Sequence, residues 1–147
     1  MIDRRQLARL TLILLLVAAS RILRLDVWSM QPGPDEVWSV WQTLGSLQDV
    51  IRWTPYDWPP GYYVTLWFWR NLVGIHPIAV RMLSVFAMLI GAAAMYRAGR
   101  LWSGRRAGTF AAIAYSALGY IIFLSIELRG YALLLGLMPL ALWLMLR

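Results

Sequence analysis

Long apolar stretches, separated by shorter polar segments, make up most of this chain. A helix that crosses a bilayer needs about 20 predominantly apolar residues, and four stretches approach that length. We place these candidate spans at about 7–25, 78–96, 107–126 and 131–147. The pattern predicts an all-α fold, a polytopic membrane helix bundle with about four spans, of which the last is short for a full crossing.

The first apolar stretch also has features of a secretory signal peptide. Arg4, Arg5 and Arg9 stand at its start, and the small residues 17–20 resemble a cleavage site. We nevertheless expect this stretch to be retained as a helix. Its flanking Arg residues favour a cytoplasmic N-terminus, because cytoplasmic loops collect basic residues.

Segment 26–77, between the first two spans, is too long for a plain connection. A Pro- and Gly-containing break ends at Pro34, and a helix is expected to begin at Asp35. Apolar residues then recur at helical spacing as far as Ile51, with a weak point near Gly45. Trp residues in this segment are typical of the lipid headgroup level, so we predict a helix that lies on the membrane surface.

Residues 61–73 form a second apolar segment in the same loop. They are too few to cross ~30 Å of hydrocarbon as a helix. Arg70 and the neighbouring aromatic residues are typical of an interfacial helix. We therefore predict two interfacial juxtamembrane helices in an extracytoplasmic loop, 26–77. With 61–73 lying flat, the Arg-rich segment 97–106 joins the N-terminus in the cytoplasm of a multi-pass plasma- or inner-membrane protein.

Composition narrows the possible chemistry. Of the 147 residues, 61% are apolar, against about 45–50% in a soluble domain. The absence of Cys excludes disulfides, thiolate metal sites and cysteine nucleophiles. None of the 14 basic residues is Lys, which excludes Schiff-base chemistry and favours bidentate recognition of phosphate by Arg. The net charge of +7 reflects Arg residues that flank apolar spans, so we expect membrane lipid and no nucleic acid as a partner.

Two adjacent carboxylates, Asp35 and Glu36, stand at the head of the first interfacial helix. Carboxylates beside a bilayer are costly unless they have a function, which points to chemistry on a lipid-linked substrate. A carboxylate in the first turn of a helix is also stabilised by the free backbone N–H groups there. The interpretation of Asp35 as a simple N-cap therefore remains open.

Further charged residues lie on the same side in this topology: Asp57, Arg81, Glu127 and Arg129. Carboxylates that accept a proton and Arg residues that hold a phosphate would then meet at one interface. A local ion pair between Glu127 and Arg129, with Arg129 anchored among the headgroups, is an equally open interpretation. His76, the single His, is interpreted as a solvated loop residue.

Five short motifs cover nearly the whole chain: Pro34–Val37, Asp57–Tyr63, Arg81–Phe86, Tyr96–Arg106 and Glu127–Leu133. In this order and spacing they resemble motifs of the protein O-mannosyltransferase and aminoarabinose-transferase families. These belong to the GT-C class of polytopic glycosyltransferases, which use sugars linked to polyprenyl phosphate. The resemblance implies that residues 1–147 correspond to the N-terminal transmembrane module of such an enzyme, acting on the extracytoplasmic side.

The resemblance also implies roles for the candidate residues. Asp35 would accept the proton of the acceptor, with Glu36 as its neighbour. Arg129 is the first candidate to bind the lipid phosphate and Arg81 the second. The remaining candidates for substrate binding are Glu127, Tyr131 and Asp57. No metal site is predicted, and participation of a divalent cation stays open.

Two departures from the family pattern qualify the resemblance. Several relatives carry His before Pro-Pro, where this chain has Trp58. Such enzymes also usually run to several hundred residues, which implies that these 147 residues are inactive alone and require the remainder of a longer chain or other membrane subunits.

The competing hypothesis is a short, non-catalytic membrane subunit that serves as a scaffold or accessory component of a larger complex. It predicts no enclosed cavity, whereas the enzyme predicts that Asp35 and Arg129 face a common outer cavity. A small transporter is disfavoured, because no predicted span carries an ionisable residue near its middle.

Overall fold

The computed structural model describes residues 4–28, 33–58 and 60–147. Within these ranges the structure is all-helical and has no strand, which confirms the predicted fold class at this level. In chain order the helices are α1 (Arg4–Trp28), α2 (Pro34–Gln42), α3 (Leu47–Trp53), α4 (Pro60–Val73), α5 (Pro77–Ala117), α6 (Gly119–Leu124) and α7 (Tyr131–Met145).

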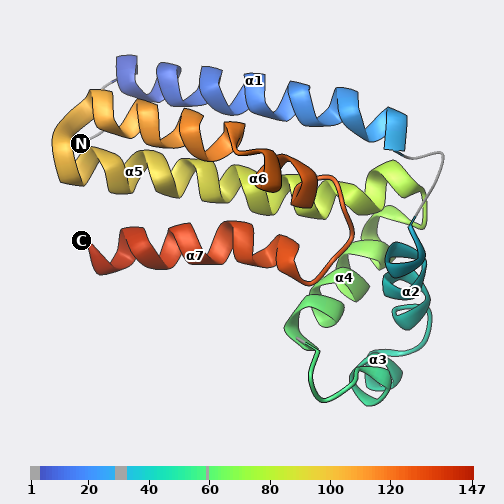
Figure 1. Cartoon of the computed structure of the whole chain (residues 1–147). Coiled ribbons are helices and arrows are strands. Elements are labelled where there is room, and N and C mark those ends of the chain that lie inside the picture. Colours follow the sequence, from blue (N-terminus) through green and yellow to red (C-terminus); the bar gives the residue numbers. More distant parts are fainter. Residues whose placement is uncertain (1–3, 29–32, 59) are drawn as a thin grey trace.

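Helices α1, α5 and α7 lie side by side as a bundle, with α6 continuing the second half of α5 (Figure 1). The short helices α2, α3 and α4 stand together beyond one end of that bundle. The chain termini lie at the opposite end. The connection between α6 and α7, which includes Leu128, thereby lies next to α2.

Helix α5 consists of two arms that meet at a sharp turn. Ser103 and Gly104 leave the helical conformation, and Gly104 has φ 85°, which Gly adopts without steric cost. The Arg-rich segment 97–106, which separates two predicted spans, is therefore helical on both sides of these two residues. Its Arg and Ala residues are good helix formers. A Cβ on Gly108 would lie 2.6 Å from the Tyr96 carbonyl oxygen, so glycine permits the close approach of the arms.

The contact between α5 and α7 depends on Pro139. Proline lacks an N–H, so the carbonyl of Leu135, one turn earlier, loses its helical donor. The Tyr115 hydroxyl donates a hydrogen bond of 2.5 Å to that carbonyl. Gly91 makes room, because a Cβ there would lie 2.0 Å from the same oxygen. One proline, one tyrosine and one glycine thus bring three helical segments together.

A second break interrupts the segment predicted as a single span at 107–126. Leu118 is extended, with φ −62° and ψ 124°, and separates α5 from α6. Arg21 of α1 is 4% exposed and donates from Nη2 to the Ser116 carbonyl just before this break. A cation near the carbonyl end of a helix is favourable, which accounts for a buried Arg at this position.

One helix among the described residues, α5, is long and apolar enough to cross a membrane. Its most apolar stretch has a mean hydropathy of 2.0, and half of that stretch is buried within the protein. Core helices of soluble proteins meet the same criterion. Helix α7 is apolar but has only 15 residues.

The structure replaces the first of the two predicted interfacial helices with two shorter ones, α2 and α3. Ser46 starts α3 as an N-cap that accepts from the Asp49 N–H, while the Asp49 carboxylate accepts from the Ser46 N–H. Those two hydrogen bonds terminate the preceding segment near Gly45. The Ser46 hydroxyl also donates to the Asp49 carboxylate, and this bond, followed by the one from the Ser46 N–H, lowers the pKa of Asp49. Helix α4 covers the second predicted segment and packs Leu66 against Val50 of α3.

Candidate functional site

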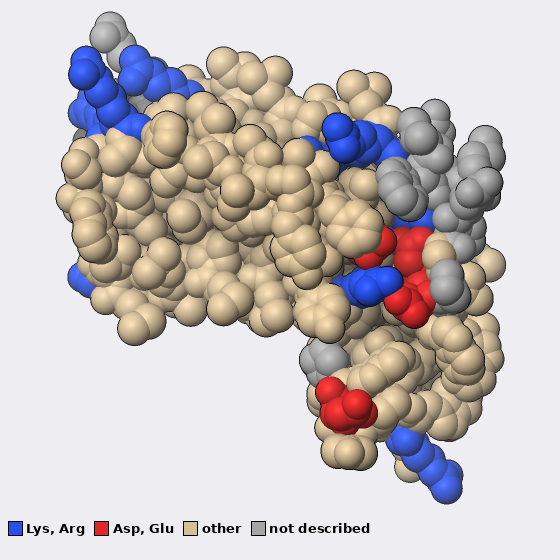
Figure 2. Space-filling view, viewed as in Figure 1, with Lys and Arg blue, Asp and Glu red and all other residues tan. Residues whose placement is uncertain are grey.

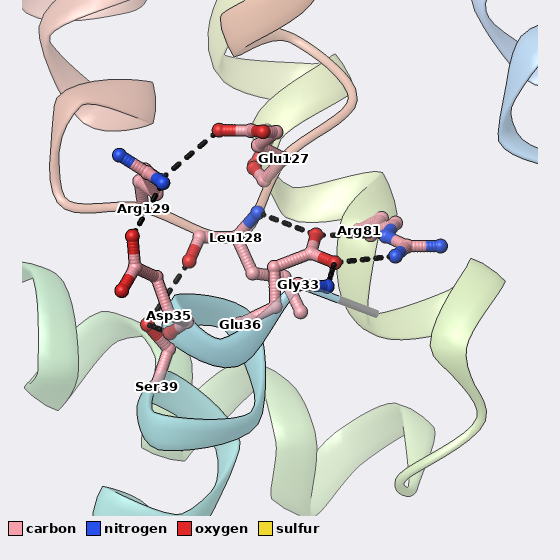
Figure 3. Close-up of polar contacts among 9 residues, drawn as sticks. Gly33, Asp35, Glu36, Ser39, Arg81, Glu127, Leu128 and Arg129 are labelled. Carbon is pink, nitrogen blue, oxygen red and sulfur yellow. Dashed lines mark hydrogen bonds and ion pairs between the residues drawn. The ribbon is translucent and has the colours of Figure 1, made fainter. Parts of the chain in front are cut away.

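Glu36 and Arg81 form a buried ion pair between α2 and α5 (Figure 3). Arg81 Nε donates to Glu36 Oε1 at 2.9 Å and Nη2 to Oε2 at 2.5 Å. The side chains are 1% and 7% exposed respectively. The backbone N–H groups of Leu128 and Gly33 also donate to Glu36, at 3.1 and 3.3 Å. A carboxylate has about four acceptor positions, so Glu36 has none left for a ligand.

The start of α2 explains how Glu36 reaches this position. Gly33 is the N-cap and Pro34 the first helical residue, which makes Asp35 the second and Glu36 the third. Glu36, at the third position, reaches back to the Gly33 N–H. The interpretation of Asp35 as the N-cap is therefore wrong, because the helix begins one residue earlier than predicted.

The connection between α6 and α7 is fixed by its backbone. Besides the Leu128 N–H, the Leu128 carbonyl accepts from the Ser39 hydroxyl at 3.0 Å. The Glu127 carbonyl accepts from the Ser84 hydroxyl at 2.5 Å. Side chains of α2 and α5 thus hold residues 127 and 128 on both sides, which determines where the next residue, Arg129, projects.

Arg129 lies between two carboxylates (Figure 3). Its Nη2 pairs with Asp35, and its Nε lies 3.1 Å from Oε2 of Glu127, close enough for an ion pair but without hydrogen-bond geometry. The Asp35 side chain is 58% exposed and that of Arg129 39%, whereas Glu127 is only 15% exposed. Arg129 therefore remains accessible to an anion from solvent.

Glu127 experiences opposing influences. Partial burial raises the pKa of its carboxyl, Arg129 lowers it, and the nearby carboxylates of Glu36 and Asp35 raise it again. The net pKa lies above the ordinary value of a glutamate. Asp35, Glu36 and Glu127 have only Arg81 and Arg129 as cationic partners. Glu127 has no hydrogen bond from either Arg, so its charged form is the one that is disfavoured.

A cavity of about 580 Å³ opens beside Asp35 and Arg129. The first half of α2, the loop before α4 and the first turns of α4 and α7 line it. Its size suits a small ligand. Its polar lining comes from Asp35, Ser39, Asp57, Arg129 and the aromatic hydroxyls, and its apolar lining includes Leu133, Leu134 and Leu137.

Aromatic residues form another part of the cavity lining. Trp58 stacks on Tyr63 with ring centroids 5.7 Å apart and planes at 17°, and Tyr62 meets Tyr63 edge to face at 5.2 Å. Burial raises the pKa of both tyrosines, so both hydroxyls stay protonated. The Tyr62 hydroxyl is buried and has no hydrogen-bond partner among the described residues.

The structure divides the predicted site residues into two groups. Asp35, Asp57, Arg129 and Tyr131 line the cavity. Glu36 and Arg81 lie outside its lining as the buried pair, and Glu127 contacts Arg129 without lining the cavity. The motif Asp57–Tyr63 contains Trp58, Tyr62 and Tyr63, but the sequence pattern predicted no role for these aromatic residues. Their clustering after a Pro-rich turn was the available signal.

The described residues do not include three or more Asp, Glu or His side chains grouped so that they could hold a metal ion. The carboxylates of Asp35 and Glu127 both pair with Arg129. Their arrangement fits an anion at the guanidinium better than a cation between the carboxylates.

No protein-family model matches this chain, and no curated protein or solved structure matches it either.

Proposed function

We propose that this chain carries the donor-binding and proton-accepting part of a GT-C-type membrane glycosyltransferase, which transfers a sugar from polyprenyl phosphate to an acceptor. One observation carries the proposal: Asp35 and Arg129, from opposite ends of the sequence, line one cavity that also has an apolar wall. A proton acceptor, a phosphate-binding cation and a surface for a lipid chain are the three components that this reaction needs.

The proposed membrane arrangement uses four helical segments as spans. These are α1, the first arm of α5, the second arm of α5 together with α6, and α7. At 1.5 Å per residue, the 15 residues of α7 cover roughly 22 Å, so its ends would approach the headgroups. On the face in Figure 2, the described charged side chains at the bundle end that bears the termini are basic, whereas acidic and basic ones occur together at the other end. This distribution supports a cytoplasmic N-terminus and an outer site.

The reaction is a substitution at the anomeric carbon of the donor sugar. A lone pair on the acceptor oxygen forms the new carbon–oxygen bond, the bond to the phosphate oxygen breaks, and its electron pair stays on the phosphate. The proton of the acceptor hydroxyl moves to the Asp35 carboxylate. Arg129 stabilises the charge that develops on the phosphate through its N–H donors. The leaving phosphate is already a stable anion, so the reaction requires no general acid.

Arg129 has a second role in this scheme, because it already pairs with Asp35. A phosphate group entering the cavity would compete with Asp35 for the guanidinium. Once phosphate binds Arg129, Asp35 would be released to accept a proton. The exposure of both side chains permits this exchange without unfolding of the surrounding helices.

The alternative hypothesis, a non-catalytic scaffold subunit, predicts no enclosed cavity, whereas the enzyme predicts an outer cavity shared by Asp35 and Arg129. The cavity beside Asp35 therefore favours the enzyme. The exposed apolar side chains along the bundle, such as Leu23, Phe110 and Met138, fit lipid as well as a partner subunit and do not discriminate between the two.

The test of the proposed function is the substitution Asp35→Asn in membranes that contain the full-length protein. We expect release of polyprenyl phosphate from its sugar-loaded form to fall by about 10²–10⁴-fold, the usual contribution of a positioned base. Mass spectrometry of extracted lipids measures this release. Asp49→Asn is the matched control, because Asp49 bonds to Ser46 outside the cavity. Unchanged release by a folded Asp35→Asn protein would refute the assignment.

A further inference from the structure

Trp58 lines the cavity and remains partly exposed there. Its stacking on Tyr63 occupies one face of the indole, with ring planes at 17°. Trp58 is nevertheless 39% exposed, whereas Tyr63 beneath it is 4% exposed. A tryptophan that served only the core would be covered on both faces, because large apolar rings contribute most to stability when they are fully buried.

Asp57 gives this surface a polar neighbour. Its carboxylate lines the same cavity, is exposed, and appears in no ion pair among the described residues. Carboxylates accept hydrogen bonds from hydroxyl groups, and the C–H face of a pyranose or furanose packs on the flat face of an indole. An open aromatic ring beside a free carboxylate is therefore suited to a carbohydrate.

We propose that Trp58 and Asp57 form the subsite for the donor sugar, with Trp58 stacking against the sugar ring and Asp57 accepting from its hydroxyls. This inference rests on the proposed function, because it assigns one part of the same donor to one part of the same cavity. It makes Trp58 a residue that determines donor recognition.

The distribution of the other lining residues gives the ligand a direction. Leu133, Leu134 and Leu137 belong to α7, whereas Asp57 and Trp58 precede α4. Arg129 lies just before the first turn of α7, so a phosphate bound to it would sit at the start of the leucine-lined wall, which leaves the Trp58 side of the cavity for the sugar. Tyr62 also lines the cavity, but its hydroxyl is buried and does not face the ligand.

The experiment measures binding of two probes to the full chain in lipid nanodiscs. One probe is undecaprenyl phosphate without a sugar, and the other is undecaprenyl phosphate that carries glucose, mannose or arabinose, tested separately. Wild type should bind at least one loaded probe more tightly than the bare one, by on the order of 3–10-fold. Trp58→Ala should remove this preference and leave binding of the bare probe unchanged, while Trp58→Phe should retain part of it.

Two further variants separate the roles of the cavity residues. Arg129→Gln should weaken binding of bare and loaded probes alike, because both contain the phosphate. Trp102→Ala, which changes an 80% exposed tryptophan beside the turn at Ser103 and outside the cavity lining, should change neither. Circular dichroism of each variant establishes that its helices are intact.

The outcomes distinguish the two proposals. If wild type binds no undecaprenyl phosphate, the proposed function fails and the sugar subsite fails with it. If wild type binds the bare probe but prefers none of the loaded ones, the sugar subsite alone is overturned. The same holds if Trp58→Ala weakens both probes equally or leaves the preference intact. Loss of preference in Trp58→Ala but not in Trp102→Ala supports the subsite.

Discussion

Two neighbouring residues of α2 enter two ion pairs with opposite properties. Glu36 and Arg81, the buried pair, have side chains that are 7% and 1% exposed. Two backbone N–H groups donate further hydrogen bonds to the Glu36 carboxylate. Asp35 and Arg129, the open pair, are 58% and 39% exposed and line the cavity. Residue type and sequence position are nearly the same, so burial alone separates a pair that holds the fold from a pair available to a ligand.

The physical reason lies in the cost of removing charge from water. A buried ion pair is stable only when its geometry is good and further hydrogen bonds satisfy both partners. The buried pair meets this condition for Glu36. An exposed pair contributes little to stability because water screens it, and it exchanges partners at little cost. Arg129 can therefore exchange Asp35 for a phosphate, whereas Arg81 cannot leave Glu36 without a large loss of stability.

The largest expected effect comes from breaking the buried pair. Arg81→Ala should lower the free energy of unfolding by about 3–5 kcal/mol, because it leaves the Glu36 carboxylate buried without its cation. Denaturant unfolding in detergent micelles measures this loss. Arg52→Ala, at an exposed Arg of α3, should change stability by about 0.5 kcal/mol or less. A loss below about 1 kcal/mol for Arg81→Ala would contradict the structural role of the pair.

Double-mutant cycles compare the two pairs directly. The coupling energy between Glu36 and Arg81 should be about 2–3 kcal/mol, at the upper end for residues in contact. The coupling between Asp35 and Arg129 should be about 0.2–1 kcal/mol, as for exposed ion pairs. Both are measured as free energies of unfolding. Equal couplings would mean that the difference in burial does not determine the roles of the two pairs.

The smallest effect concerns Glu127 and pH. Its pKa is higher in the folded than in the unfolded protein, chiefly because of burial, so the folded state binds more protons between the two values. Stability attributable to Glu127 is therefore complete below its unfolded pKa and is lost as pH rises through its folded pKa. Across this interval the free energy of unfolding should fall more steeply with rising pH for wild type than for Glu127→Gln, as measured by denaturant unfolding at a series of pH values. A parallel pH dependence would disprove this linkage.

Some features of the candidate site were predictable from sequence because they are local. Asp35 follows a Pro- and Gly-rich break, Arg129 follows an apolar run, and both stood out as charged residues at the ends of predicted helices. Apolar periodicity predicted helical segments near α1, α4 and α7. The split of the first interfacial helix into α2 and α3 was missed, since it depends on reciprocal hydrogen bonds between Ser46 and Asp49 that apolar periodicity does not reveal.

The sequence by itself determined the helical class, the places where apolar segments begin and end, and which charged residues were available for chemistry. The tertiary structure decided which of Asp35 and Glu36 faces the cavity. Adjacent helical residues point about 100° apart, so one of the two had to face α5 and the other away from it. Arg81 of α5 and the Leu128 N–H lie on the Glu36 side, which leaves Asp35 to Arg129 and the cavity. No local pattern encodes that choice, because both partners come from distant parts of the chain.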